Sequence, residues 1–66
     1  MKRGTKLLCI KQMEDYREEN GIDFIQGKEY EIESYDKGEI YVESEDGSSV
    51  LFDVDVDFYE YFKLAA

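Results

Sequence analysis

The sequence predicts an all-β fold, built as a small sandwich or barrel. Glycine-containing turn signals follow one another at intervals of about ten residues, at 26–28, 36–39 and 45–48. The segments between them are short and rich in tyrosine, isoleucine, valine and phenylalanine, which favour strands. Apolar and acidic residues alternate in segment 28–35, as they do in a strand with one buried and one solvated face.

We expect five strands. The first spans 6–12 and holds a near-continuous apolar run, which suits burial on both faces. Residues 13–20 and 22–25 form the arms of a long hairpin loop, which the strong turn signal Asn20-Gly21 closes. Three meander strands follow the later turn signals, at 28–35, 39–44 and 48–53.

The C-terminal segment leaves two choices open. Residues 54–57 either continue the preceding strand or form a 3₁₀ turn. Phe58 and Phe62 have the four-residue spacing of a helix face, whereas Phe62 and Leu64 have the two-residue spacing of a strand face. We expect a strand over 58–64.

A chain of 66 residues forms a single small domain with a thin core, because it buries only about 60% of the surface that its unfolded form exposes. We place this domain at residues 1–62. Residues 63–66 read Lys-Leu-Ala-Ala and resemble the linker that an expression vector leaves before a histidine tag. The alternative is that the terminal Leu-Ala-Ala is the end of a bacterial degradation tag.

The composition argues against an enzyme and against a cofactor. The chain has no histidine, so it lacks the usual general base near neutral pH and the commonest metal ligand. We expect its single cysteine, Cys9, to be a buried hydrophobic side chain in the first strand rather than a reactive thiol. We interpret Glu29, Glu31 and Glu33 as the solvated face of a strand.

Three aspartates invite a metal interpretation. Asp53, Asp55 and Asp57 have the spacing of a calcium-loop opening, but such a loop needs glycine at its sixth position and glutamate at its twelfth. Counted from Asp53, these positions hold Phe58 and Leu64. We therefore expect no metal, and we interpret the segment as a strand with solvated acids and buried valines.

The chain is strongly acidic, with 17 acidic residues against 8 basic ones and a net charge of −9. Residues 1–17 hold five basic and two acidic residues, net +3, whereas residues 18–62 hold two basic and fifteen acidic residues, net −13. Such a surface repels phosphate backbones, which argues against direct nucleic-acid binding. It attracts basic surfaces, so the expected partner is a larger protein with a basic surface.

No apolar run approaches the roughly 18 residues of a membrane span. The run at 7–10 is also shorter than a signal-peptide core of about 7–15 residues. A free cysteine suits a reducing compartment. We therefore expect a soluble cytoplasmic protein that does not bind membranes.

The tyrosines are candidates for an interface. Tyr35 and Tyr41 are expected to point outward on neighbouring strands, and Tyr59 and Tyr61 to share a strand face near the C-terminus. Tyrosine is enriched at interface hot spots. The alternative is ordinary cross-strand packing, because aromatic residues favour strands in any case.

Segment 23–32 is similar to the diverging turn of Src-homology-3 (SH3) domains, and 38–42 falls where their third strand begins. The resemblance covers residues 6–64. It extends to short bacteriophage-encoded proteins, which often pair a Cys-Ile first strand with a Lys/Gln-Gly-Lys-x-Tyr turn. It implies a five-stranded SH3-like barrel with a long first hairpin loop and a 3₁₀ turn before the last strand.

The peptide-binding members of this family hold polyproline segments in a groove that uses tryptophan and proline. This chain has neither, and only Tyr16 and Tyr59 match the groove aromatics, so we do not expect proline-rich ligands. The family's acidic hairpin loop, which contacts an arginine or lysine of the partner, is retained. Its acids here are Glu14, Asp15, Glu18, Glu19 and Asp23.

The sequence supports two hypotheses of function. The first is a non-enzymatic, acidic protein-interaction module, which in a bacteriophage would bind and modulate a host protein. The alternative is an acidic nucleic-acid mimic that inhibits a DNA- or RNA-binding enzyme. The candidate partner-binding residues are Tyr16, Glu18, Glu19, Tyr35, Tyr41, Asp55, Asp57, Tyr59 and Tyr61.

Overall fold

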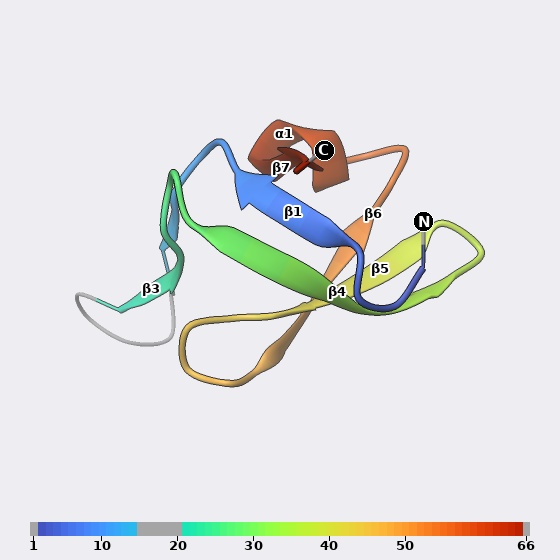
Figure 1. The fold of residues 1–66 in the computed structure, drawn as a ribbon, viewed down its shortest axis with the longest axis horizontal. Helices are drawn as coiled ribbons and strands as arrows, with labels where there is room; N and C mark the ends of the chain where they lie inside the picture. Colours follow the sequence, from blue (N-terminus) through green and yellow to red (C-terminus); the bar gives the residue numbers. More distant parts are fainter. Residues whose placement is uncertain (1, 15–20, 66) are drawn as a thin grey trace.

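The computed structural model describes residues 2–14 and 21–65. Five strands form one antiparallel sheet in the order β6-β5-β4-β1-β7, and the sheet curls into a half-barrel (Figure 1). The strands are β1 (Lys6–Cys9), β4 (Glu29–Asp36), β5 (Glu39–Glu43), β6 (Ser49–Asp53) and β7 (Phe62–Leu64). The expected all-β class is confirmed, and the three meander strands begin and end within a residue of the expected positions.

The arms of the expected hairpin loop form a separate two-stranded ladder, in which β2 (Met13–Glu14) pairs with β3 (Ile22–Phe24). β1 is shorter than expected. It ends at Cys9 because the chain bends at Lys11, whose carbonyl accepts a hydrogen bond from the Cys9 thiol at 3.1 Å. The turn expected at Asn20-Gly21 lies partly outside the described residues.

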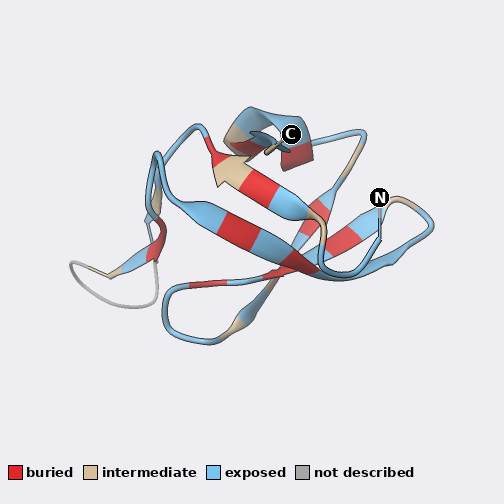
Figure 2. Cartoon of the chain, viewed as in Figure 1, coloured by how far each residue is buried: buried red, intermediate tan, exposed pale blue. Residues whose placement is uncertain are grey.

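The core lies inside the curl and is centred on Phe62. The ring of Phe62 lies 5.1 Å from that of Phe24 and 5.2 Å from that of Phe52. It also stacks on the ring of Phe58 at 5.7 Å. Aromatic pairs of this kind contribute about 0.5–1.5 kcal/mol each beyond their burial. Figure 2 shows the buried positions, whose hydrophobic members are Leu7, Cys9, Phe24, Tyr30, Ile32, Ile40, Val42, Phe52, Phe58 and Phe62.

A β-bulge divides β4 into two halves. The register shifts between Ile32 and Ser34, so Ser34 lies opposite Tyr41 and Tyr35 lies opposite the buried Ile40. Residues that lie directly opposite in a ladder share a face, so Tyr35 faces the core side of the sheet at its margin. The expectation that Tyr35 and Tyr41 point outward together is therefore wrong, because the bulge adds a residue to the alternation.

The C-terminal segment combines both interpretations of its apolar spacing. A turn follows β6, in which the Asp53 carbonyl accepts the N–H groups of Val56 and Asp57, each at 3.1 Å. One helical turn, α1 (Phe58–Tyr61), then leads into β7. The expected strand over 58–64 is thus wrong for its first four residues, and the mixed i+3 and i+4 bonds of the turn at 54–57 do not confirm the expected 3₁₀ turn.

The valines of the turn after β6 differ from their expected burial. Val54 is half-buried against the core, but Val56 is 79% exposed at the tip of the turn. Lys63 and Leu64 belong to β7, where they lie opposite Leu8 and Leu7 of β1. The assignment of residues 63–66 to a vector stays a prediction.

We expect Phe62→Ala to lower the free energy of unfolding by about 3–5 kcal/mol, because it removes the ring on which four other aromatic rings pack. The matched control is Leu64→Ala in the same strand, whose side chain is 47% exposed. Urea denaturation followed by circular dichroism measures both. Equal losses for the two variants would contradict a core centred on Phe62.

Candidate functional site

An apolar pair lies at the centre of the outer face of β5 and β6. Tyr41 and Leu51 lie directly opposite each other in the ladder, and they are 37% and 46% exposed. Their neighbours Ile40 and Phe52 point into the core, so the pleat turns Tyr41 and Leu51 outward. Opposite Cβ atoms lie about 4.5–5.5 Å apart, so the two side chains form one patch.

Acidic side chains flank this pair along and across the strands. Glu39 and Glu43 lie two residues to either side of Tyr41 on β5 and share its face. Asp36 of β4 and Asp53 of β6 lie opposite Glu39 on its two sides. Three carboxylates thus form a row across three neighbouring strands.

Glu33 adds a further acid to the same surface. Its carboxylate accepts a hydrogen bond from the Ser49 hydroxyl of β6 at 2.7 Å, which places it on the outer side of the intervening β5. We call this surface the acidic face. Its members are Glu33, Asp36, Glu39, Tyr41, Glu43, Leu51 and Asp53.

No lysine or arginine occurs in β4, β5 or β6, and Lys37 lies in the turn between the first two of these strands. Like charges that lie directly opposite in a sheet destabilise it. Carboxylates outnumber basic groups on the acidic face, where Arg3 lines a small pocket with Glu33 and Glu43, and this excess would attract a basic surface.

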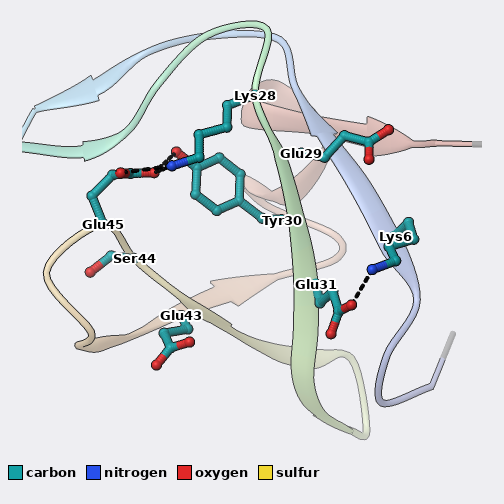
Figure 3. A pocket seen from close by; sticks show the side chains of 8 residues that line it. All are labelled: Lys6, Lys28, Glu29, Tyr30, Glu31, Glu43, Ser44 and Glu45. Atoms are coloured by element: carbon teal, nitrogen blue, oxygen red, sulfur yellow. Dashed lines mark hydrogen bonds and ion pairs between the residues drawn. The ribbon is translucent and has the colours of Figure 1, made fainter.

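A polar groove of about 390 Å³ opens between the first half of β4 and the segment after β5. In Figure 3 the side chains of Lys28, Tyr30 and Glu45 meet at one end of the groove, and Lys6 reaches Glu31 at the other. The residues that line it are Lys6, Lys28, Glu29, Tyr30, Glu31, Glu43, Ser44 and Glu45.

Tyr30 is the centre of the hydrogen bonds in this groove. Its hydroxyl accepts the N–H of Ile25 at 2.8 Å and donates to the Glu45 carboxylate at 2.6 Å. The Lys28 ammonium lies 2.7 Å from the same carboxylate. The Glu45 N–H donates to the carbonyl of Asp23 at 2.9 Å. These bonds hold β3, β4 and the turn after β5 together, so we interpret them as a structural clamp.

The clamp shifts the pKa values of its members in opposite directions. Hydrogen bonds from Lys28 and Tyr30 hold the pKa of Glu45 below its usual value. Burial and the hydrogen bond to Glu45 raise the pKa of Tyr30 to about 12. At neutral pH Glu45 is therefore charged and Tyr30 is neutral, the forms in which the hydroxyl donates to the carboxylate.

Tyr59 and Tyr61 do not share a face as expected, because both lie in α1 rather than in a strand. Tyr59 is 53% exposed, and its ring packs on that of Phe58 at 4.9 Å. Tyr61 instead packs on the core ring of Phe52 at 5.9 Å, and the Lys11 ammonium lies 5.3 Å from its ring centroid. Neither tyrosine belongs to the acidic face.

Asp55 and Asp57 lie in the turn after β6, where the aspartates hold the backbone. The Asp57 carboxylate accepts the N–H of Asp53 at 2.8 Å, and the Asp53 carboxylate accepts that of Asp55 at 2.8 Å. The expected strand is therefore wrong for residues 54–57, which form a turn that the Asp53 and Asp57 carboxylates hold, whereas Asp53 ends β6, and Asp53 and Asp55 are exposed as expected.

Three further candidates, Tyr16, Glu18 and Glu19, lie outside the described residues. Of the six candidates that the structure describes, only Tyr41 lies on the acidic face. Sequence reasoning missed Leu51, although a signal was present: with Val50 and Phe52 inward, the alternation turns Leu51 outward.

The described residues contain no group of three or more acidic or cysteine side chains arranged to hold a metal ion. In the same part of the chain, no helix has the length and apolar character needed to cross a membrane. No protein-family model, curated protein or solved structure matches the chain.

We expect Glu45→Gln to lower the free energy of unfolding by about 1 kcal/mol at neutral pH, because it weakens the contacts with Lys28 and Tyr30. The pKa of Glu45 is lowered by folding, so this stabilisation is complete above its usual value of 4.5 and is lost as the pH falls below it. The difference between wild type and variant should therefore shrink in acid.

Urea denaturation at a series of pH values measures this difference. Lys28→Met serves as the paired variant, because it removes the other charge of the ion pair, and its deficit should shrink over the same acidic range. A difference that stays constant from neutral pH into acid would contradict the clamp.

We expect Tyr30→Phe to cost about 1–3 kcal/mol, because it leaves the Ile25 N–H without its acceptor. The raised pKa of Tyr30 means that its hydroxyl stabilises the fold fully below pH 10 and loses this effect as the pH rises toward about 12. An alkaline titration of tyrosinate absorbance should show a late-ionising tyrosine in wild type that the variant lacks. Identical titration curves would exclude this role.

Proposed function

We propose that the chain is a non-enzymatic interaction module whose acidic face binds a larger protein with a basic surface. The observation that carries the proposal is the exposed Tyr41–Leu51 pair at the centre of a sheet face whose charged strand residues are all acidic. Interfaces commonly combine an apolar or aromatic centre with a polar rim, and tyrosine is enriched at their hot spots. The acids around the pair would speed encounter and select a basic partner.

The finer description of the fold is part of the same proposal. We infer an SH3-like barrel, which is supported by the strand order β6-β5-β4-β1-β7 and by the long connection from β1 to β4 that carries β2 and β3. The helical turn α1 would stand where the family has a 3₁₀ turn. The resemblance to short bacteriophage proteins suggests a host protein in the cytoplasm as the partner.

A nucleic-acid mimic is the second candidate. The observation that favours it is the row of carboxylates from Asp36 through Glu39 to Asp53, which crosses three strands on one face. A mimic would compete with DNA or RNA for an enzyme, and its binding would weaken steeply with salt. Binding through the Tyr41–Leu51 pair would depend less on salt.

We expect the double variant Tyr41→Ser, Leu51→Ser to capture its partner from a bacterial lysate at least about tenfold less well than wild type, since hot-spot truncation costs about 2 kcal/mol or more. Quantitative mass spectrometry of crosslinked complexes measures the capture. The matched control is Val56→Ser, Tyr59→Ser, which removes a more exposed apolar pair outside the acidic face.

The control variant should capture the same basic proteins as wild type. Equal loss in the two double variants, or no loss in either, would overturn the assignment to the acidic face. If Glu39→Gln, Glu43→Gln abolishes capture while the Tyr41–Leu51 variant retains it, the nucleic-acid mimic replaces the interaction module.

A further inference from the structure

The outer strand β6 pairs with β5 on one side, and no strand of the described residues pairs with its other edge. β6 and β7 stand at opposite ends of the strand order, and no ladder joins them (Figure 1). Their core side chains meet through the rings of Phe52 and Phe62 at 5.2 Å, so the curl brings the faces together without pairing the edges. β7 is three residues long and carries Lys63, whereas β6 is five residues long, has no proline or bulge, and has one charged residue, Asp53, at its C-terminal end. Charged residues, proline and bulges are the usual guards of an edge.

The hydrogen-bonding pattern shows which backbone groups of β6 point outward. The Val54 N–H bonds the Gly38 carbonyl at 2.9 Å, and the Ser44 N–H bonds the Ser48 carbonyl at 2.8 Å. In an antiparallel ladder, hydrogen-bonded pairs alternate with non-bonded pairs. The even-numbered residues of β6 therefore bond β5, and the odd-numbered residues turn their backbone groups away from it.

One end of this edge is closed by the chain itself. The outward N–H of Asp53 bonds the Asp57 carboxylate at 2.8 Å, and its carbonyl accepts the N–H groups of Val56 and Asp57. The outward N–H and carbonyl groups of Ser49 and Leu51 have no such bond within the described chain. The open part of the edge thus lies beside the acidic face, where Leu51 is 46% exposed and Val50 is half-buried on the opposite side.

We infer that this edge takes an extended segment of the partner as an added strand, in which basic residues alternate with apolar ones. The added strand bonds the free backbone groups of Ser49 and Leu51, the mode of recognition that exposed sheet edges allow. Its side chains on the outer face meet Leu51 and the carboxylate of Asp53, so a basic residue beside an apolar contact fits there. Its side chains on the other face extend the apolar surface of Val50 and Phe52.

Charge complementarity selects this occupant over a second copy of the chain. Each copy carries a net charge of −9, so edge pairing of two copies brings two acidic faces side by side, where they repel. The inference rests on the proposed function for the basic character of the partner. It adds backbone pairing, which docking through side chains alone does not require.

The test uses a blocked synthetic peptide of alternating lysine and valine, about seven residues long, which matches the length of a short strand. NMR titration of the full chain should show shifts centred on the amides of Ser49 and Leu51, and their hydrogen exchange should slow by at least about tenfold on saturation. The same peptide with alternate backbone nitrogens methylated cannot pair along an edge and should not bind.

Leu51→Pro supplies the matching change in the protein. The N–H of Leu51 points away from β5, and proline is tolerated at an edge position of this kind. The variant therefore removes one outward hydrogen-bond donor and leaves the hydrogen bonds between β5 and β6 in place. It should bind the lysine–valine peptide at least about tenfold more weakly than wild type. The methylated peptide gives the same information with unaltered protein should the variant not fold.

The outcomes separate this inference from the proposed function. Binding that survives both backbone methylation and Leu51→Pro, but is lost in Tyr41→Ser, overturns the added strand and leaves the acidic face as the docking surface. Equal protection of Ser49 and Leu51 by a glutamate–valine peptide supports edge pairing and overturns the basic partner. Protection that rises with the concentration of the chain alone shows that a second copy occupies the edge, which overturns the inference.

Discussion

The packing of Phe62 is the constraint on which the rest of the structure depends. A chain this short has one thin core, and Phe62 brings β7 against rings from β3, β6 and α1. Strands at opposite ends of the sheet can meet around one ring only if the sheet curls. The curl buries the inward apolar side chains in the core, and every outward side chain of β5 and β6 is exposed to solvent. The acidic face and the open edge of β6 are thus consequences of how the core is closed.

Charge and stability are divided between different regions of the molecule. The clamp formed by Lys28, Tyr30 and Glu45 pairs a basic residue with an acid and satisfies a backbone N–H, so it stabilises the fold. On the acidic face the strands themselves supply no basic residue, although Arg3 lines a small pocket together with Glu33 and Glu43. The row of Asp36, Glu39 and Asp53 leaves an excess of carboxylates on this face, which is the physical basis for proposing a basic partner.

The sequence predicted the strands better than the faces. Turn signals and alternation placed β4, β5 and β6 almost correctly, because Gly38 and Gly47 adopt the positive φ that these turns require. The bulge after Ile32 could not be predicted, since one additional residue leaves the composition of a strand unchanged, and it moved Tyr35 away from Tyr41. The helical turn at 58–61 was missed because its phenylalanine spacing fits a helix and a strand in succession. The outward position of Leu51 could have been predicted from the inward Val50 and Phe52, but the three residues form a continuous apolar run in which the alternation is not visible.

The bulge also determines how β4 tolerates changes in its length. Glu33 is the surplus residue of the strand, because Ile32 faces Val42 and Ser34 already faces Tyr41. Deleting Glu33 would leave a regular ladder in which each remaining side chain keeps its present face. Deleting Glu31, by contrast, would move the inward side chains of the adjoining half-strand to the outer face and the outward ones to the core. The extra residue therefore separates two halves of β4 that alternate independently between the inner and outer face. Evolution could lengthen or shorten β4 at this position without moving core side chains to the outer face.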